Sequence, residues 1–170
     1  RVIFYIHGEA HLAALHVARA LAQARAAGFV GERVLGSDFS VAAEIRRGAG
    51  GFVLGEETAL MESIEGRRAM PRPKPPFPTE SGVHGRPTVI NNVETLCTSA
   101  WILANGWEAY RSVGTKESPG SKLFCLSGHV ERPGVYEVPF GTTLRELLEL
   151  AGGVAGGKEL QCILIGGAAG

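Results

Sequence analysis

The feature that most constrains this sequence is a glycine-rich segment near residue 50. Residues 48–51 read GAGG, three apolar residues follow at 52–54, and Gly55 separates them from Glu56 and Glu57. Glycine lets a backbone turn tightly or approach a ligand closely, because it has no Cβ. The apolar triplet is too short for a helix and predicts a buried strand. The two glutamates favour the first turn of a helix, where the helix dipole stabilises negative charge.

Local physics leaves two interpretations of this segment open. One is a tight strand-to-helix connection with helix-stabilising acids, and the other is a turn that faces a ligand. Generic nucleotide motifs do not decide between them. No glycine stands at position 53, so the segment is not G-x-G-x-x-G, and no Walker lysine follows Gly55.

The flanking sequence alternates between strand and helix patterns. We predict a strand at 2–6, an alanine-rich helix over 10–27 capped by Gly28, and a strand at 40–46. A further helix should run from Glu56 to about Gly66. This order predicts an α/β layer domain, in which ligands bind at the carboxyl ends of the strands, where the glycine-rich segment falls.

A proline-rich segment follows, with five prolines in residues 71–78. It excludes helix and central strand and favours an extended, polyproline-like path. It could be a stiff linker or a ligand for another domain. Lys74 and Phe77 suggest a third interpretation, because a cation and a flat ring on a stiff backbone can grip a nucleotide.

Residues 87–96 predict a strand that leads into a helix capped by Asn91 or Asn92. Capping explains the asparagines, and a phosphate site at the helix N-terminus is the alternative. The helix should end at residues 105–106, and a short helix is predicted over 107–113. We expect Trp101 and Trp107 in the core.

The polar segment 114–121 predicts a linker between a domain at 1–113 and a second at 122–170. In the second domain we predict a hairpin from strands at 122–130 and 135–139, and a helix capped by Thr142 or Thr143. Gly152 and Gly153 should close that helix, and a last strand should lie at 161–165. A domain of about 50 residues is small for a free-standing core.

Composition excludes several classes of protein. The 170 residues carry 17 basic and 17 acidic side chains, which gives no indication of a nucleic-acid partner. No apolar run is long enough to span a membrane and no signal peptide is recognisable, so we expect a cytoplasmic location, either free or peripheral to a membrane within a complex. The cysteines (Cys97, Cys125 and Cys162) lack metal-site spacing and are expected to be buried hydrophobes. The histidines at 7, 11 and 16 could suggest a metal site, but no further ligands accompany them, and we expect surface or capping histidines instead.

The run GAGGFVLGEETALMESIEGRRAMPRPKPPFP, followed by GRPTVINNVETL, closely resembles the NADH-binding flavoprotein subunit of respiratory complex I. The same family supplies the diaphorase subunits of NAD-dependent formate dehydrogenases and hydrogenases. The resemblance covers nearly the whole chain. It implies an NADH:quinone-type oxidoreductase subunit that passes electrons from NADH through FMN to iron–sulfur clusters in partner subunits. The second domain resembles the β-grasp, ubiquitin-like domain of this family and is interpreted as a docking module.

The resemblance also implies roles for particular residues. Phe52, Gly55, Glu56 and Glu57 would lie against flavin and nicotinamide, with Glu57 as the catalytic carboxylate. Asn91 and Asn92 would contact FMN, and Lys74 and Phe77 would bind the dinucleotide. No residue would serve as nucleophile or proton shuttle.

Two departures from the family pattern bear on these roles. Phe52 and Leu54 stand where the family has tyrosine and cysteine. The other glycine-rich loop of the family should precede Arg1, and the cysteines of a [4Fe–4S] cluster should follow Gly170, so we expect a piece of a longer protein that is inactive by itself. The sequence does not name the final electron acceptor. A non-catalytic scaffold that kept the fold is the competing hypothesis.

Overall fold

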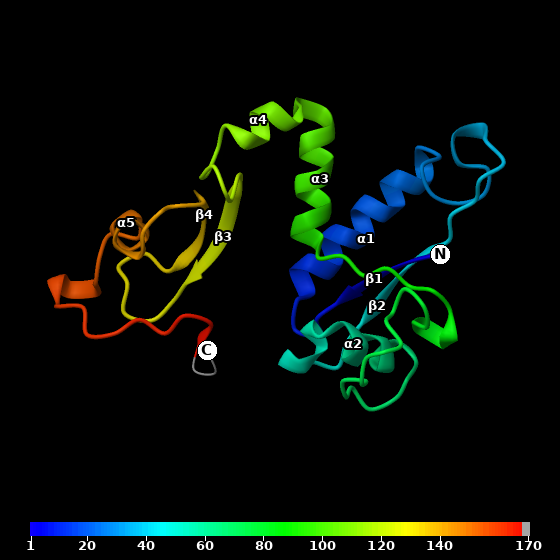
Figure 1. Cartoon of the computed structure of the whole chain (residues 1–170), viewed down its shortest axis with the longest axis horizontal. Coiled ribbons are helices and arrows are strands. Elements are labelled where there is room, and N and C mark those ends of the chain that lie inside the picture. Colours follow the sequence, from blue (N-terminus) through cyan, green and yellow to red (C-terminus); the bar gives the residue numbers. More distant parts are fainter. Residues whose placement is uncertain (168–170) are drawn as a thin grey trace. The chain divides into compact units, whose positions relative to one another are not determined.

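The computed structural model describes residues 1–167 of the chain (Figure 1). Contacts divide it into two compact units, Arg1–Ile90 and Asn91–Gly170. The mixed α/β class predicted from the sequence is confirmed. The predicted linker at 114–121 lies inside the second unit, and its role as a domain boundary stays a prediction.

The first unit is built on a strand–helix–strand motif. Strand β1 (Val2–Ile6) and strand β2 (Ala43–Arg47) pair in parallel, with Val2 opposite Ala43. Helix α1 (His11–Ala26) connects them and packs against both, as Figure 1 shows. Its predicted cap at Gly28 is confirmed: that residue has φ +74° and its N–H donates to the carbonyl of Arg25. A parallel pair needs such a crossover, because a short turn cannot return the chain in the same direction.

Helix α2 (Glu57–Ile64) follows β2 and buries three side chains, those of Thr58, Ala59 and Met61. Ala59 and Met61 are fully buried, and Leu54 packs just before the helix at 4% exposure. The hydroxyl groups of Tyr5 on β1 and Ser63 on α2 are hydrogen-bonded at 2.7 Å. The core of the first unit therefore lies at the helix that the two glutamates begin.

Two predicted strands of the first unit are wrong. Residues 52–54 form part of a 3-10 turn, Phe52–Gly55, in which the N–H of Leu54 donates to Gly51 and that of Glu56 donates to Val53. Gly50 and Gly51 have φ of +90° and +133°, so they turn the chain before a strand can continue. Residues 87–90 belong to no strand, because the sheet described for this unit contains β1 and β2 alone.

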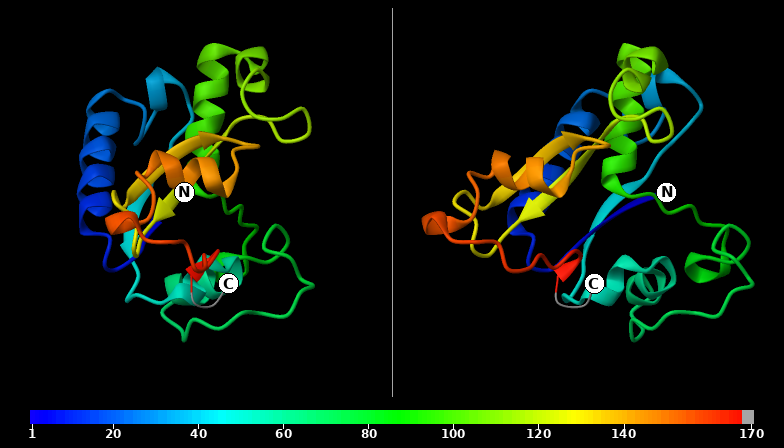
Figure 2. Two further views of the ribbon diagram at one scale, coloured as in Figure 1. Left: turned by 90° about the vertical axis from the view of Figure 1, so that its left-hand side faces the viewer. Right: turned by 60° about the vertical axis from the view of Figure 1, so that its left-hand side comes forward.

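The second unit begins with helices α3 (Val93–Asn105) and α4 (Trp107–Arg111), both predicted. Strands β3 (Ser121–Leu126) and β4 (Gly134–Pro139) then form the expected antiparallel hairpin, with helix α5 (Leu144–Leu150) beside it (Figure 2). The buried hydrophobic side chains of this unit are Val138 on β4, Leu147 on α5 and Ala151 just after α5. Further 3-10 turns occupy Val34–Gly36, Val83–Gly85 and Ala155–Gly157.

Three expectations for the second unit are wrong in the described chain. Residues 161–165 form no strand. Trp101 and Trp107 are 46% and 61% exposed, and Cys97, Cys125 and Cys162 are exposed as well. A hairpin and one short helix bury few side chains, so apolar residues on α3 and on the unpaired segment stay at the surface.

Candidate functional site

The glycine-rich segment starts at the carboxyl edge of the parallel strands. The N–H of Gly48 donates to the carbonyl of Ile6 at 2.9 Å, which joins the ends of β2 and β1. A Cβ at Gly8 would collide with the carbonyl oxygen of Gly48, and a Cβ at Gly48 would collide with the ring of Tyr5. Glycine is therefore required where the two loops meet, and the segment lies at the predicted ligand edge.

Glu56 is the N-cap of α2. Its Oε2 accepts hydrogen bonds from the N–H groups of Thr58 (2.9 Å) and Ala59 (2.8 Å) and from the Thr58 hydroxyl. Partial burial raises the pKa of Glu56, but these hydrogen bonds outweigh it and hold the pKa below its ordinary value, with Lys74 adding to the effect. One oxygen of this carboxylate is therefore committed to the helix, while Oε1 faces a cation.

That cation is Lys74 of the proline-rich segment. Its ammonium group forms an ion pair with Glu57 Oε1 and lies 3.6 Å from Glu56 Oε1. The hydrogen bond with Glu57 raises the pKa of Lys74. All three side chains remain 33–39% exposed, and an ion pair so exposed contributes little to stability. Its importance lies in bringing together three predicted site residues.

The chain next to Glu56, Glu57 and Lys74 is accessible at Gly55 and at Phe52. A Cβ built on Gly55 meets no heavy atom within 4 Å, so a flat molecule could approach its backbone closely. Phe52 is 93% exposed, whereas Leu54, the other departure from the family pattern, is buried. Phe77 is 52% exposed and its N–H donates to Glu80 Oε2 at 3.1 Å. Both phenylalanine rings are thus accessible.

Asn91 and Asn92 belong to the second unit. Asn92 caps α3, since its Oδ1 accepts from the N–H of Glu94 at 2.8 Å, and Asn91 is exposed. The capping interpretation is confirmed for Asn92. The FMN contacts predicted for both residues stay a prediction that rests on the resemblance.

Sequence reasoning missed Arg72. Its side chain bonds to Glu62 on α2 and to Glu65 at the C-terminal cap of that helix, and its N–H donates to the hydroxyl of Thr58 at 2.8 Å. The sequence signal was a basic residue among prolines, but nothing in that pattern identifies partners ten and seven positions away on a helix.

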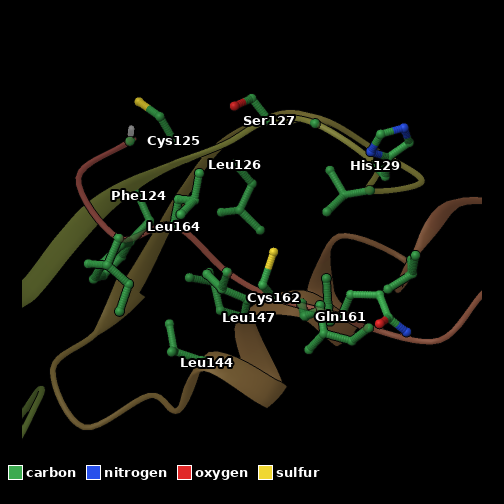
Figure 3. A pocket seen from close by; sticks show the side chains of 18 of the residues that line it. Phe124, Cys125, Leu126, Ser127, His129, Leu144, Leu147, Gln161, Cys162 and Leu164 are labelled. Carbon is green, nitrogen blue, oxygen red and sulfur yellow. The ribbon is translucent and has the colours of Figure 1, made fainter. Parts of the chain in front are cut away.

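The second unit contains a cavity of about 720 Å³ (Figure 3). It lies between β3, α5 and residues 158–167, and the side chains of Leu126 and Cys162 point toward one another across it, whereas Cys125 points away. Its lining is mainly apolar and contains none of the predicted site residues. The cavity follows from the unpaired course of residues 161–165, which leaves space over the hairpin.

Residues 1–167 show neither a metal cluster nor a membrane-spanning helix. No group of three or more His, Cys, Asp and Glu side chains is placed to hold a metal ion. No helix in this part of the chain combines the length and the apolar character needed to cross a membrane.

Comparison with known proteins gave consistent matches. The model of the Nuo51 FMN-binding domain matches residues 1–100, and that of the SLBB domain matches residues 123–165. The F subunit of the NADH-quinone oxidoreductase of Salmonella typhimurium is 48% identical over 169 residues, and that of Mycobacterium tuberculosis (strain H37Rv) is 49% identical over 163 residues. These alignments cover 99% and 96% of this chain but 38% and 37% of the relatives. The crystal structure of an air-oxidised NAD⁺-reducing [NiFe]-hydrogenase matches with a TM-score of 0.77 and 42% identity, covering 91% of this chain and 25% of that one.

Proposed function

The chain belongs to the family of the Nuo51 FMN-binding domain, here followed by an SLBB domain, and from this premise we propose that the protein is the electron-input subunit of an NADH dehydrogenase. It would oxidise NADH through FMN and deliver electrons to iron–sulfur clusters in a multisubunit oxidoreductase. The observation that carries the proposal is the meeting of Lys74 with Glu56 and Glu57 beside the open backbone of Gly55.

The residues of the first unit fit a flavin and a dinucleotide. The open space at Gly55 admits a flat ring against the backbone, where a side chain would fill it. The chemistry that flavin supplies when bound is hydride acceptance, for which no side chain here is suited. FMN contacts at Asn91 and Asn92 are part of the proposal on the resemblance alone.

Three side chains have defined tasks in this proposal. Glu57 makes a polar contact to the nicotinamide and places negative charge where a reduced, electron-rich ligand would otherwise bind too tightly. Lys74 offers its ammonium group to a phosphate or polar edge of the dinucleotide. The dinucleotide then replaces the Glu57 carboxylate as the partner of Lys74. Phe77, half-exposed, offers a ring for stacking.

The likeness to the NAD⁺-reducing hydrogenase favours a second candidate of the same chemistry. In that case the protein would be a diaphorase subunit that exchanges electrons with a hydrogenase or formate dehydrogenase. The residues of the site would act in the same way, because the final acceptor lies in other subunits.

An anaerobic visible spectrum of the complete protein, before and after NADH is added, tests the proposal. We expect a flavin band that bleaches with NADH. A colourless protein that ignores NADH, even after reconstitution with FMN, would instead indicate a non-catalytic scaffold that kept the fold.

A further inference from the structure

We infer that Arg72 is a positioning residue, which holds the proline-rich segment on α2 and thereby sets the place of Lys74 and the affinity of the site for the dinucleotide. The part of this inference that concerns affinity rests on the proposed function. The part that concerns placement rests on contacts of Arg72 within the first unit.

The backbone of Arg72 is attached to the N-terminus of α2. Its N–H donates to the Thr58 hydroxyl at 2.8 Å, and that same hydroxyl donates to the Glu56 carboxylate. Thr58 is 1% exposed and fully satisfied by these two bonds. A single residue, Thr58, therefore links the backbone of Arg72 to the Glu56 carboxylate, which faces Lys74.

The side chain of Arg72 is attached further along the same helix. Its guanidinium group bonds to Glu62, and also to Glu65 Oε2 at 3.0 Å. The two glutamate side chains are 15% and 5% exposed, and that of Arg72 is 25% exposed. Shielding from water strengthens charged hydrogen bonds, and the planar guanidinium fork bonds two carboxylates in a fixed geometry that a flexible ammonium group does not impose.

Glu65 also attaches the far end of the segment. Its Oε1 accepts from the N–H of His84 at 2.7 Å, while its Oε2 bonds to Arg72. Partial burial raises the pKa of Glu65, but the bonds from His84 and Arg72 outweigh it and lower the pKa below its ordinary value. The stretch from 72 to 84 thus starts and ends at one ionised carboxylate.

The first half of the segment has few other contacts, because its prolines lack N–H groups and Pro73, Pro75 and Pro76 are exposed. The second half is held separately: Pro78 is buried, and its carbonyl accepts a hydrogen bond from the N–H of Thr88. Proline fixes its own φ and restricts the residue before it, so fixing Arg72 also limits the directions in which the chain can reach Lys74 through Pro73. The ion pair of Lys74 with Glu57 is consistent with this placement.

Arg67 provides a matched control. It bonds to the same two carboxylates, Glu62 and Glu65, but its side chain is 59% exposed and it lies before the proline-rich segment. Replacing Arg67 with methionine removes the same charge from the same partners and leaves the attachment of the segment intact.

The test uses the complete protein in its complex, with Arg72→Met, Arg67→Met, Lys74→Met and the Arg72→Met/Lys74→Met double variant. We expect Arg72→Met to raise KM for NADH about tenfold with kcat changed less than about twofold, because an interaction that binds rather than reacts is lost. In the Lys74→Met background, Arg72→Met should change KM by less than about twofold, because its effect passes through Lys74. Arg67→Met should leave both constants unchanged.

Hydrogen exchange provides a readout that needs no turnover. Amides of residues 72–85 should exchange faster in Arg72→Met than in Arg67→Met or the unaltered protein. Equal exchange in the two arginine variants would overturn the placement, whatever the activity. Additive effects of Arg72→Met and Lys74→Met on KM would overturn the action through Lys74.

Failure of the proposed function is distinguishable from failure of the inference about Arg72. If the proposed function fails, the unaltered protein does not oxidise NADH, while the hydrogen-exchange comparison still decides whether Arg72 holds the segment. If Arg72→Met does not assemble, Arg72→Lys replaces it, and we expect KM to rise about threefold, since lysine keeps the charge and loses the bridge. An Arg72→Lys protein with unchanged KM and exchange contradicts the inference.

Discussion

Glu57 and Lys74 lie 17 positions apart and meet in an ion pair at the N-terminus of α2. Beside them, Glu56 is held by the helix it caps, while Glu57, the first residue of the helix, directs its carboxylate to a long, flexible side chain. Adjacent glutamates therefore make different contacts: Glu56 caps the helix, and Glu57 forms the ion pair with Lys74.

Replacement of Glu57 with glutamine in the complete protein should impair NADH oxidation. We expect kcat/KM for NADH to fall about tenfold or more, because the carboxylate charge toward nicotinamide and Lys74 is lost. Steady-state kinetics with an artificial acceptor measures this. Glu108→Gln serves as control, since Glu108 also lies in the first turn of a helix, α4, and should have no effect. Equal kinetics for the two variants would exclude Glu57 from the site.

Helix ends account for much of the local order in both units. Glu56 caps α2 and Asn92 caps α3, while Thr143 and Glu146 form a reciprocal capping box at α5. A cap satisfies N–H groups that have no partner within the helix, so it fixes where the helix begins. In α2 the starting point also decides where Glu57 stands relative to the proline-rich segment.

Replacement of Glu56 with alanine should destabilise α2 by about 1 kcal/mol at neutral pH, the usual effect of losing an N-cap. The capping bonds hold the pKa of Glu56 low in the folded chain, so their contribution is complete above the ordinary carboxyl pKa and is lost as pH falls through the lowered value. Protection factors of α2 amides, measured by hydrogen exchange, should therefore be lower in Glu56→Ala than in the unaltered chain at neutral pH. In acid the protection factors of the two should converge.

Glu80→Ala provides the comparison for that experiment. Glu80 is exposed and its carboxylate accepts a hydrogen bond from Phe77 outside any helix. This variant should leave the protection of α2 unchanged. A difference between Glu56→Ala and the unaltered chain that persists undiminished in acid would show that the carboxylate charge is not what caps α2.

At the scale of the molecule, the described chain consists of two units with small cores. The first has a two-stranded parallel sheet, and the second has a two-stranded hairpin with one helix. Many large apolar side chains are exposed, including Leu103 at 88% and Val89 at 75%. The chain also spans well under half of the length of its NADH-quinone oxidoreductase relatives.

We predict that the 170-residue chain by itself neither retains FMN nor oxidises NADH, since a site formed by part of the relatives' length should lack part of its wall. NADH-dependent reduction of ferricyanide, measured beside the complete protein, checks this. Activity in the short chain comparable to that of the complete protein would contradict the prediction.

The sequence by itself determined the α/β class, α1 with its glycine cap, the start of α2, α3, and the β3–β4 hairpin with α5. These features depend on short-range physics: apolar periodicity, caps and turn residues act between neighbours in the chain. Sequence also indicated Glu56, Glu57 and Lys74 as members of one site, but through the resemblance of two long blocks and not through local pattern.

Tertiary structure alone decided the features that depend on distant partners. Phe52–Gly55 is a turn and residues 161–165 are not a strand, because a strand needs a neighbour that no local pattern supplies. The exposure of Trp101 and of the cysteines depends on what covers them. The bridge from Arg72 to Glu62 and Glu65 forms only when the chain folds back on α2. Such a contact depends on both partners at once, and nothing in the local sequence of either one identifies the other.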